Sequence, residues 1–108
     1  MNRNFCQTIT VRCDDPEQLI ELLTEWDLTQ ATSDIMGYMG TRVLADREKL
    51  GQYVIIADFG VVDPQVSAAD EAARNNARTE TRAFAARVRE VLDGEPEYHH
   101  FDEIYRTD

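Results

Sequence analysis

The sequence is poor in the residues that carry covalent and metal chemistry. Of its 108 residues only two are cysteines, Cys6 and Cys13. On one extended strand these two would lie about 23 Å apart, at about 3.3 Å per residue. A disulfide needs α-carbons within about 7 Å, and the spacing fits no zinc or iron–sulfur site. We therefore expect two reduced, partly buried thiols.

Positive charge and long apolar runs are also scarce. Eleven basic residues stand against twenty-one acidic ones, which gives a net charge of −10 at pH 7. Such a surface repels phosphate backbones and anionic lipid, so neither nucleic acid nor a membrane is an expected partner. No apolar run approaches the roughly 18 residues of a membrane span, and the first residues show no signal-peptide core. These features predict a cytoplasmic protein.

The motifs of common cofactors and nucleophiles are missing as well. The sequence contains no glycine-rich phosphate loop, no clustered His/Asp/Glu metal spacing and no serine nucleophile elbow. We expect no cofactor and no metal. An RNA-recognition domain, which shares the order of elements inferred below, needs stacking aromatics and a basic surface, and the acidic composition argues against it.

What the sequence does contain is a strand, helix, strand pattern that occurs twice. Alternating or continuous apolar residues predict four strands, over residues 5–13, 35–45, 53–59 and 98–105. The third is apolar on both faces, which is typical of a central strand. The fourth is polar, which is typical of an edge.

Two helices are predicted between these strands. Asp15 suits an N-cap and Pro16 the first helical position, with an apolar stripe up to Trp26 and an end near Leu28. The second helix spans residues 68–92, with a kink or break at 78–81, where cap-type residues interrupt the stripe.

Two features inside the strands predict local geometry. Gly37 and Gly40 indicate a bulge or a close backbone approach. Asp58 interrupts the apolar third strand, and Arg42 lies on the neighbouring strand, so a cross-strand ion pair is expected.

The order βαββαβ predicts one α+β domain over residues 1–108, with a ferredoxin-like, four-stranded antiparallel sheet and the helices on one face. Right-handed crossovers place the first and third strands in the centre. The open face receives either Val54 and Ile56 or the alternate residues of that strand. Because an apolar sheet face does not stay in water, we expect a homodimer.

Several segments together resemble the dimeric α+β barrel superfamily, and within it the antibiotic-biosynthesis-monooxygenase-like proteins. They are residues 37–44 leading through a charged turn into 53–59, residues 71–76, and the closing run 93–102. The resemblance implies a homodimer with facing sheets and a small cavity between sheet and helices in each protomer. Members include cofactor-free oxygenases of aromatic or quinol substrates, haem-degrading enzymes and proteins without known activity. The haem-degrading branch uses a histidine on the second helix, and residues 68–92 contain none.

If the cavity binds a small hydrophobic or aromatic molecule, His100 is the candidate catalytic base. Its unperturbed pKa lies near neutrality, and Asp102 is expected on the same strand face. The candidate ligand-binding residues are Trp26, Tyr38, Phe59, Asn75, Asn76 and Tyr98. Each has a simpler explanation: a solvated edge residue for His100, capping of the helix break for the asparagines, and packing for the aromatics.

Two classes of function remain open at this point. One is a cofactor-independent monooxygenase-like enzyme or binder. The other is a non-catalytic dimer that binds, scaffolds or regulates. A cavity lined by convergent polar groups favours the first, and a cavity filled by Trp26 and Phe84 favours the second.

Overall fold

The computed structural model describes residues 3–107 of the chain. Along the sequence the elements are β1 (Phe5–Arg12), α1 (Pro16–Ala31), β2 (Tyr38–Ala45), β3 (Gln52–Phe59), α2 (Ala68–Asn76), α3 (Thr79–Arg89) and β4 (Glu97–Asp102).

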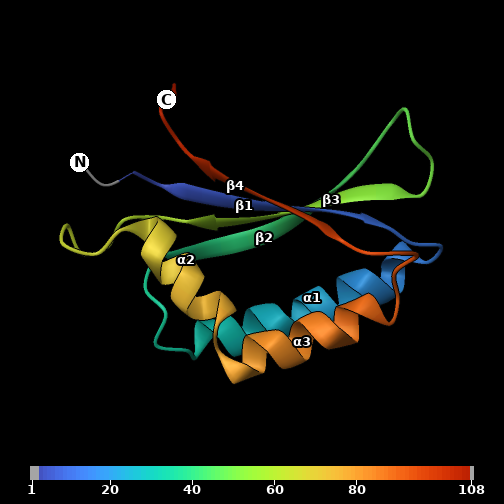
Figure 1. The fold of residues 1–108 in the computed structure, drawn as a ribbon, viewed down its shortest axis with the longest axis horizontal. Helices are drawn as coiled ribbons and strands as arrows, with labels where there is room; N and C mark the ends of the chain where they lie inside the picture. Colours follow the sequence, from blue (N-terminus) through green and yellow to red (C-terminus); the bar gives the residue numbers. More distant parts are fainter. Residues whose placement is uncertain (1–2, 108) are drawn as a thin grey trace.

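The strands form a four-stranded antiparallel sheet with the order β2-β3-β1-β4. This confirms the expected ferredoxin-like arrangement, with β1 and β3 in the centre. All three helices lie on the same side of the sheet (Figure 1). Among residues 3–107, no helix lies over the opposite sheet face.

The central strand β3 turns one set of side chains toward the helices. Ile55 and Phe59 are each 3% exposed and belong to two separate core clusters. One cluster packs Phe5 and Phe59 against α2, and the other packs Val11 and Ile55 against α1. By alternation, Val54 and Ile56 face the open side of the sheet. The sequence left this choice undecided.

The helix boundaries agree with the sequence at one end of α1 and differ at the other. Asp15 is the N-cap and accepts a hydrogen bond from the Glu17 N–H at 3.1 Å, with Pro16 next. The helix continues to Ala31, three residues past the expected end at Leu28. Threonine, glutamine and alanine are tolerated in a helix, and the extra turn brings Gln30 into the interior, where it is 4% exposed.

The second helical region is broken, as the cap-type residues predicted. Ser67 caps α2 by accepting from the Asp70 N–H at 2.9 Å. The helix stops at Asn76, and Arg78 adopts an extended conformation, φ −69° and ψ 144°, before α3.

Three strands are shorter than expected: β1 ends one residue early, at Arg12, and β2 and β4 are shortened for different reasons. β2 begins at Tyr38 because Gly37, at φ +81°, packs directly on the backbone of Gly60 and accepts its N–H at 2.7 Å. The register then shifts between Tyr38 and Gly40, so both glycine predictions are confirmed. β4 ends at Asp102 because this residue pairs with Phe5, where β1 begins.

The expected ion pair between Arg42 and Asp58 is wrong. The register places Arg42 opposite Ile56 and Asp58 opposite Gly40. Within residues 3–107 the two charged groups form no ion pair.

The two cysteines are free, as expected from their separation. Burial, followed by the nearby Asp58 carboxylate, raises the pKa of the Cys6 thiol. Burial also raises the pKa of Cys13, with Asp14 as the next cause. In the described part of the chain, no cluster of His, Cys, Asp and Glu could hold a metal, and no helix is long and apolar enough to cross a membrane.

Candidate functional site

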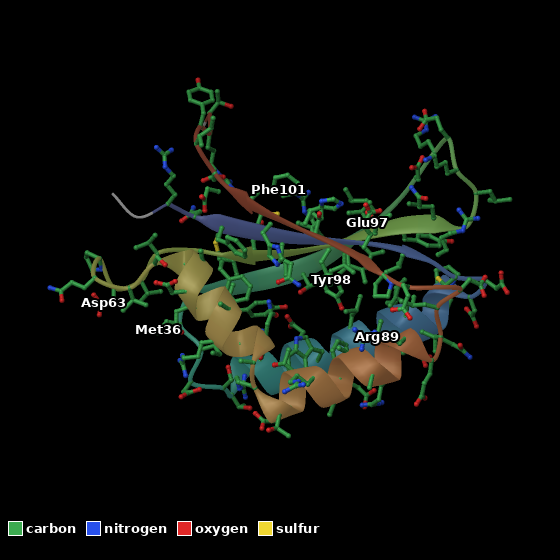
Figure 2. All side chains as sticks on the ribbon, in the orientation of Figure 1. Met36, Asp63, Arg89, Glu97, Tyr98 and Phe101 are labelled. Atoms are coloured by element: carbon green, nitrogen blue, oxygen red, sulfur yellow. The ribbon has the colours of Figure 1, made fainter. Side chains whose placement is uncertain are left out.

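A cavity of about 110 Å³ lies between the sheet and the helices, where the two core clusters separate. Its floor is the helix-facing side of β1, β2 and β3, and its other walls come from α1, α2, α3 and β4. Tyr98 extends from β4 toward the helices, whereas Phe101 lies on the open side of the same strand (Figure 2). An apolar cavity of about 150 Å³ can take up benzene, so this one is on the scale of a single aromatic ring.

Aromatic rings form two of the walls. Trp26 stacks on Phe84 with a centroid distance of 4.7 Å and an interplanar angle of 12°. Across the cavity, Tyr38 meets Phe59 edge-on at 5.7 Å. The Tyr38 hydroxyl shares a 2.6 Å hydrogen bond with Thr41 Oγ1, and burial raises the pKa of this phenol. Flat, fixed walls of this kind suit a flat, apolar ligand.

A polar corner occupies the break between α2 and α3. Arg78 donates from Nη1 to Gln30 Oε1 at 3.1 Å and to Asn75 Oδ1 at 3.2 Å. Thr81 Oγ1 also bonds Asn75 Oδ1, at 3.3 Å. Gln30 and Asn75 are 4% and 5% exposed, and both line the cavity.

The nitrogens of these amides are left without protein acceptors. Gln30 Nε2 is fully buried and makes no hydrogen bond. Across residues 3–107, no acceptor bonds the nitrogens of Asn75 or Gln7 or the indole N–H of Trp26, although all three residues line the cavity. Among the described residues that line the cavity, none is Asp or Glu. The nitrogens of Gln7, Asn75 and Trp26 keep some accessible surface and can donate hydrogen bonds to a ligand, whereas the Gln30 nitrogen is covered by its neighbours.

The structure brings six of the sequence-derived candidates to this one cavity. They are Trp26, Tyr38, Phe59, Asn75, Asn76 and Tyr98. Asn76 Nδ2 donates to Gln7 Oε1 at 2.9 Å, which joins α2 to β1 at the cavity wall. That these residues contact a ligand stays a prediction.

His100 lies outside the cavity, at its mouth. It is exposed and lines an open hollow that shares Gln7, Asn76 and Tyr98 with the cavity. Its ring stacks on Phe5 at 5.8 Å, and no hydrogen bond joins it to Asp102. Its role as a base stays a prediction, without the orienting carboxylate that the sequence suggested.

Sequence reasoning missed Gln7, Gln30 and Arg78. Gln7 lies on the inward face of β1 between Phe5 and Ile9. A polar side chain among alternating apolar ones could have indicated a functional residue. Gln30 follows the apolar stripe of α1 by one further turn, beyond the expected helix end. Arg78 gave no signal, because its acceptor Gln30 is 48 positions away in the sequence.

No protein-family model and no curated protein matches the sequence. Solved structures do match the fold. SnoaB, a cofactor-independent oxygenase from Streptomyces nogalater, superimposes with a TM-score of 0.69 at 18% identity, over 99% of this chain and 97% of that one. A “Putative antibiotic biosynthesis monooxygenase” from Nitrosomonas europaea superimposes with a TM-score of 0.67 at 10% identity, over 100% of this chain and 97% of that one. Rv0793 from Mycobacterium tuberculosis superimposes with a TM-score of 0.67 at 11% identity, over 97% of this chain and 99% of that one.

Proposed function

We propose that this chain, which has the fold of the antibiotic-biosynthesis-monooxygenase-like proteins, is a homodimeric, cofactor-independent monooxygenase-like protein. It binds a small hydrophobic or aromatic molecule between sheet and helices. The observation that supports this proposal best is the cavity itself, with stacked aromatic walls and the free N–H donors of Asn75 at one corner. Apolar walls with a few convergent polar groups are typical of ligand sites.

The size of the cavity determines how a substrate enters. One ring fits inside, and a larger molecule extends past Tyr98 into the hollow beside His100. A phenolic or enolic hydroxyl at this mouth can lose its proton to the imidazole of His100. N–H donors such as those of Asn75 or Asn76 stabilise the resulting oxyanion, and the electron-rich ring supplies the electrons for reaction with oxygen.

Anthrone is a suitable test substrate, because its oxidation by O₂ yields anthraquinone and water with no other reductant. We expect oxygen uptake with the purified protein, and a rate about a hundredfold lower in His100→Ala, the scale of a lost general base. His99→Ala is the matched control, because His99 lies on the other face of β4. There its Nε2 is 3.2 Å from Glu97 Oε1. Equal rates in both variants would remove His100 from the mechanism.

A second function has one observation in its favour. Trp26 and Phe84 line the cavity and stack on each other, and packing of this kind suits a dimer that binds or scaffolds without catalysis. Ligand binding without any oxygen uptake would favour this alternative over the oxygenase.

The proposed homodimer is supported by the open sheet face. Val54 and Ile56 lie on this face, and Leu44 is paired with Val54, whereas Phe101 lies on the far edge strand and is paired with Cys6. Leu44 and Phe101 are 44% and 52% exposed. Large apolar side chains grouped on one sheet face mark an interaction surface, and a twofold copy of the same face is the simplest cover.

A further inference from the structure

The open hollow at the cavity mouth is lined by basic and neutral side chains. Arg82 and Arg89 line it from α3, and His100 lines it from β4. Among the described residues around the hollow none is Asp or Glu, although the chain has twenty-one acidic residues against eleven basic ones. A hollow with this lining attracts an anion, whereas the net negative charge of the molecule repels one.

Arg82 differs from the arginines near it in having no acidic partner. Within residues 3–107 its guanidinium makes no hydrogen bond and no ion pair. The N–H donors of Arg82 are therefore available to a ligand. The other arginines between positions 74 and 89 each have a carboxylate within 4.0 Å, and they are Arg74, Arg78, Arg87 and Arg89.

Arg89 keeps most of its hydrogen-bonding capacity as well. Its acidic partner in the described chain is Glu95, with 4.0 Å between Nε and Oε2, and the two side chains are 50% and 90% exposed. An ion pair this long and this exposed contributes little. The anionic group of a ligand can therefore replace Glu95 at small cost.

The two arginines lie on the same face of α3. They are seven residues apart, which is two helical turns or about 10 Å along the axis. Ala85 lies between them and also lines the hollow, and its short side chain leaves the space between the two guanidinium groups open. A guanidinium presents paired N–H donors that match the two oxygens of a carboxylate, so both arginines can bind one such group.

The hollow and the cavity together form one continuous site. Tyr98 of β4 and Arg89 of α3 lie on facing elements (Figure 2) and line both spaces. The cavity measures about 110 Å³ and the hollow about 820 Å³. A ligand whose ring lies in the cavity therefore has room for a substituent beside Arg82 and Arg89.

We infer that the ligand carries a carboxylate on a short chain, and that Arg82 and Arg89 bind this group in the hollow while the ring occupies the cavity. The two arginines then determine specificity, because they favour an acid over a neutral compound with the same ring. This inference rests on the proposed function, since it assumes that the cavity binds a ring. It does not depend on whether the bound ring is oxidised.

A matched pair of probes tests the inference directly. 3-Phenylpropanoate and 3-phenylpropanamide have the same ring and chain and nearly the same shape, and only the first is charged at pH 7. Calorimetric titration gives a Kd for each probe. We expect the wild type to bind the carboxylate roughly tenfold more tightly than the amide, and this preference to fall about threefold to fivefold in Arg82→Gln and in Arg89→Gln.

A third variant controls for the overall charge of the protein. Arg87→Gln removes one positive charge from the same helix, but Arg87 is paired with Glu25 at 3.1 Å and is not among the residues that line the hollow. It should keep the preference of the wild type. Raising the salt concentration from about 50 mM to about 500 mM should weaken binding of the carboxylate and leave binding of the amide unchanged, because salt screens exposed charges.

The possible failures are distinguishable. If both probes bind the wild type with the same Kd, or if Arg87→Gln lowers the preference as much as Arg82→Gln does, the inference is overturned and the proposed ring-binding site stands. If neither probe binds the wild type, the ring-binding function fails, and the inference fails with it.

Discussion

At the scale of single residues, amides and aromatics define the site, while ionised side chains stabilise its surroundings. Glu71 is the clearest example of an ionised side chain that stabilises the surroundings of the site. It is 7% exposed, and it accepts from the Met36 N–H at 2.9 Å and from Arg74 at 3.0 Å. Arg74 also bonds the Asp34 carboxylate and carbonyl. These bonds join α2 to the segment that leads into β2, next to the cavity wall formed by Tyr38.

Glu71→Gln should lower the free energy of unfolding by about 2 kcal/mol at pH 7, the scale of hydrogen bonds to a charged group. The hydrogen bonds from Arg74, and then that from Met36, hold the pKa of Glu71 below its ordinary value of 4.5. Since the folded pKa is the lower one, this stabilisation is present above about pH 4.5 and is lost as the pH falls through the folded pKa.

Urea unfolding of wild type and variant between pH 3 and pH 7 measures this effect. The difference between the two should shrink toward pH 3. Glu90→Gln, at an exposed glutamate without a side-chain partner in the described chain, should show neither the loss nor its pH dependence. A loss that is equal at pH 3 and pH 7 would mean that the Glu71 charge is not its cause.

At the scale of secondary-structure elements, tight backbone contacts fix where β2 begins. Gly37 lies at φ +81°, and a Cβ at this position would approach the Gly60 carbonyl oxygen to 2.1 Å. Gly94 has nearly the same backbone angle, φ +82°, but open space around it. The two glycines thus separate the effect of conformation from the effect of contact.

Gly37→Ala should destabilise the protein by about 2–4 kcal/mol, because the left-handed conformation costs roughly 1–2 kcal/mol for an L-residue and the steric clash adds to it. Gly94→Ala should cost only about 1–2 kcal/mol. Equilibrium unfolding in urea gives both values. If the two variants lose the same stability, the close approach of Gly37 to Gly60 is not a constraint on the fold.

The elements could be predicted where local patterns determine them. Asp15 and Pro16 predicted the start of α1. The interrupted apolar stripe near Arg78 predicted the break between α2 and α3, and the apolar residues on both faces of β3 predicted a central strand. The end of α1 could not be predicted, because Thr29 and Gln30 are polar and the contact that buries Gln30 comes from Arg78, far along the chain. The polar corner of the site was missed for the same reason, while its aromatic walls lay within recognisable stripes and strands.

At the scale of the whole molecule, the helices of the described chain all lie on one face of the sheet, and the other face carries the proposed dimer contact. Phe101 lies on this open face, in the row of Cys6 and Asp58. Phe101→Asp removes an apolar contact worth about 1.5–3 kcal/mol from each copy. The dimer dissociation constant should rise at least tenfold.

Sedimentation equilibrium at micromolar concentration measures this change, with circular dichroism to show that the variant is folded. Leu50→Asp, on a side chain 97% exposed in the turn between β2 and β3, should leave the dimer mass unchanged. A wild-type protein that sediments as a monomer at these concentrations would contradict the dimer outright.

The central claim is that the cavity between the sheet and the helices is a ring-binding site with its donors at the α2–α3 break. A crystal structure of the protein with anthrone, the test substrate named above, tests this claim most directly. We expect the ring in contact with Trp26 and Phe84, and the ketone oxygen within hydrogen-bond distance of the Asn75 nitrogen. A structure with anthrone bound elsewhere, or with the cavity closed by its own side chains, would contradict it.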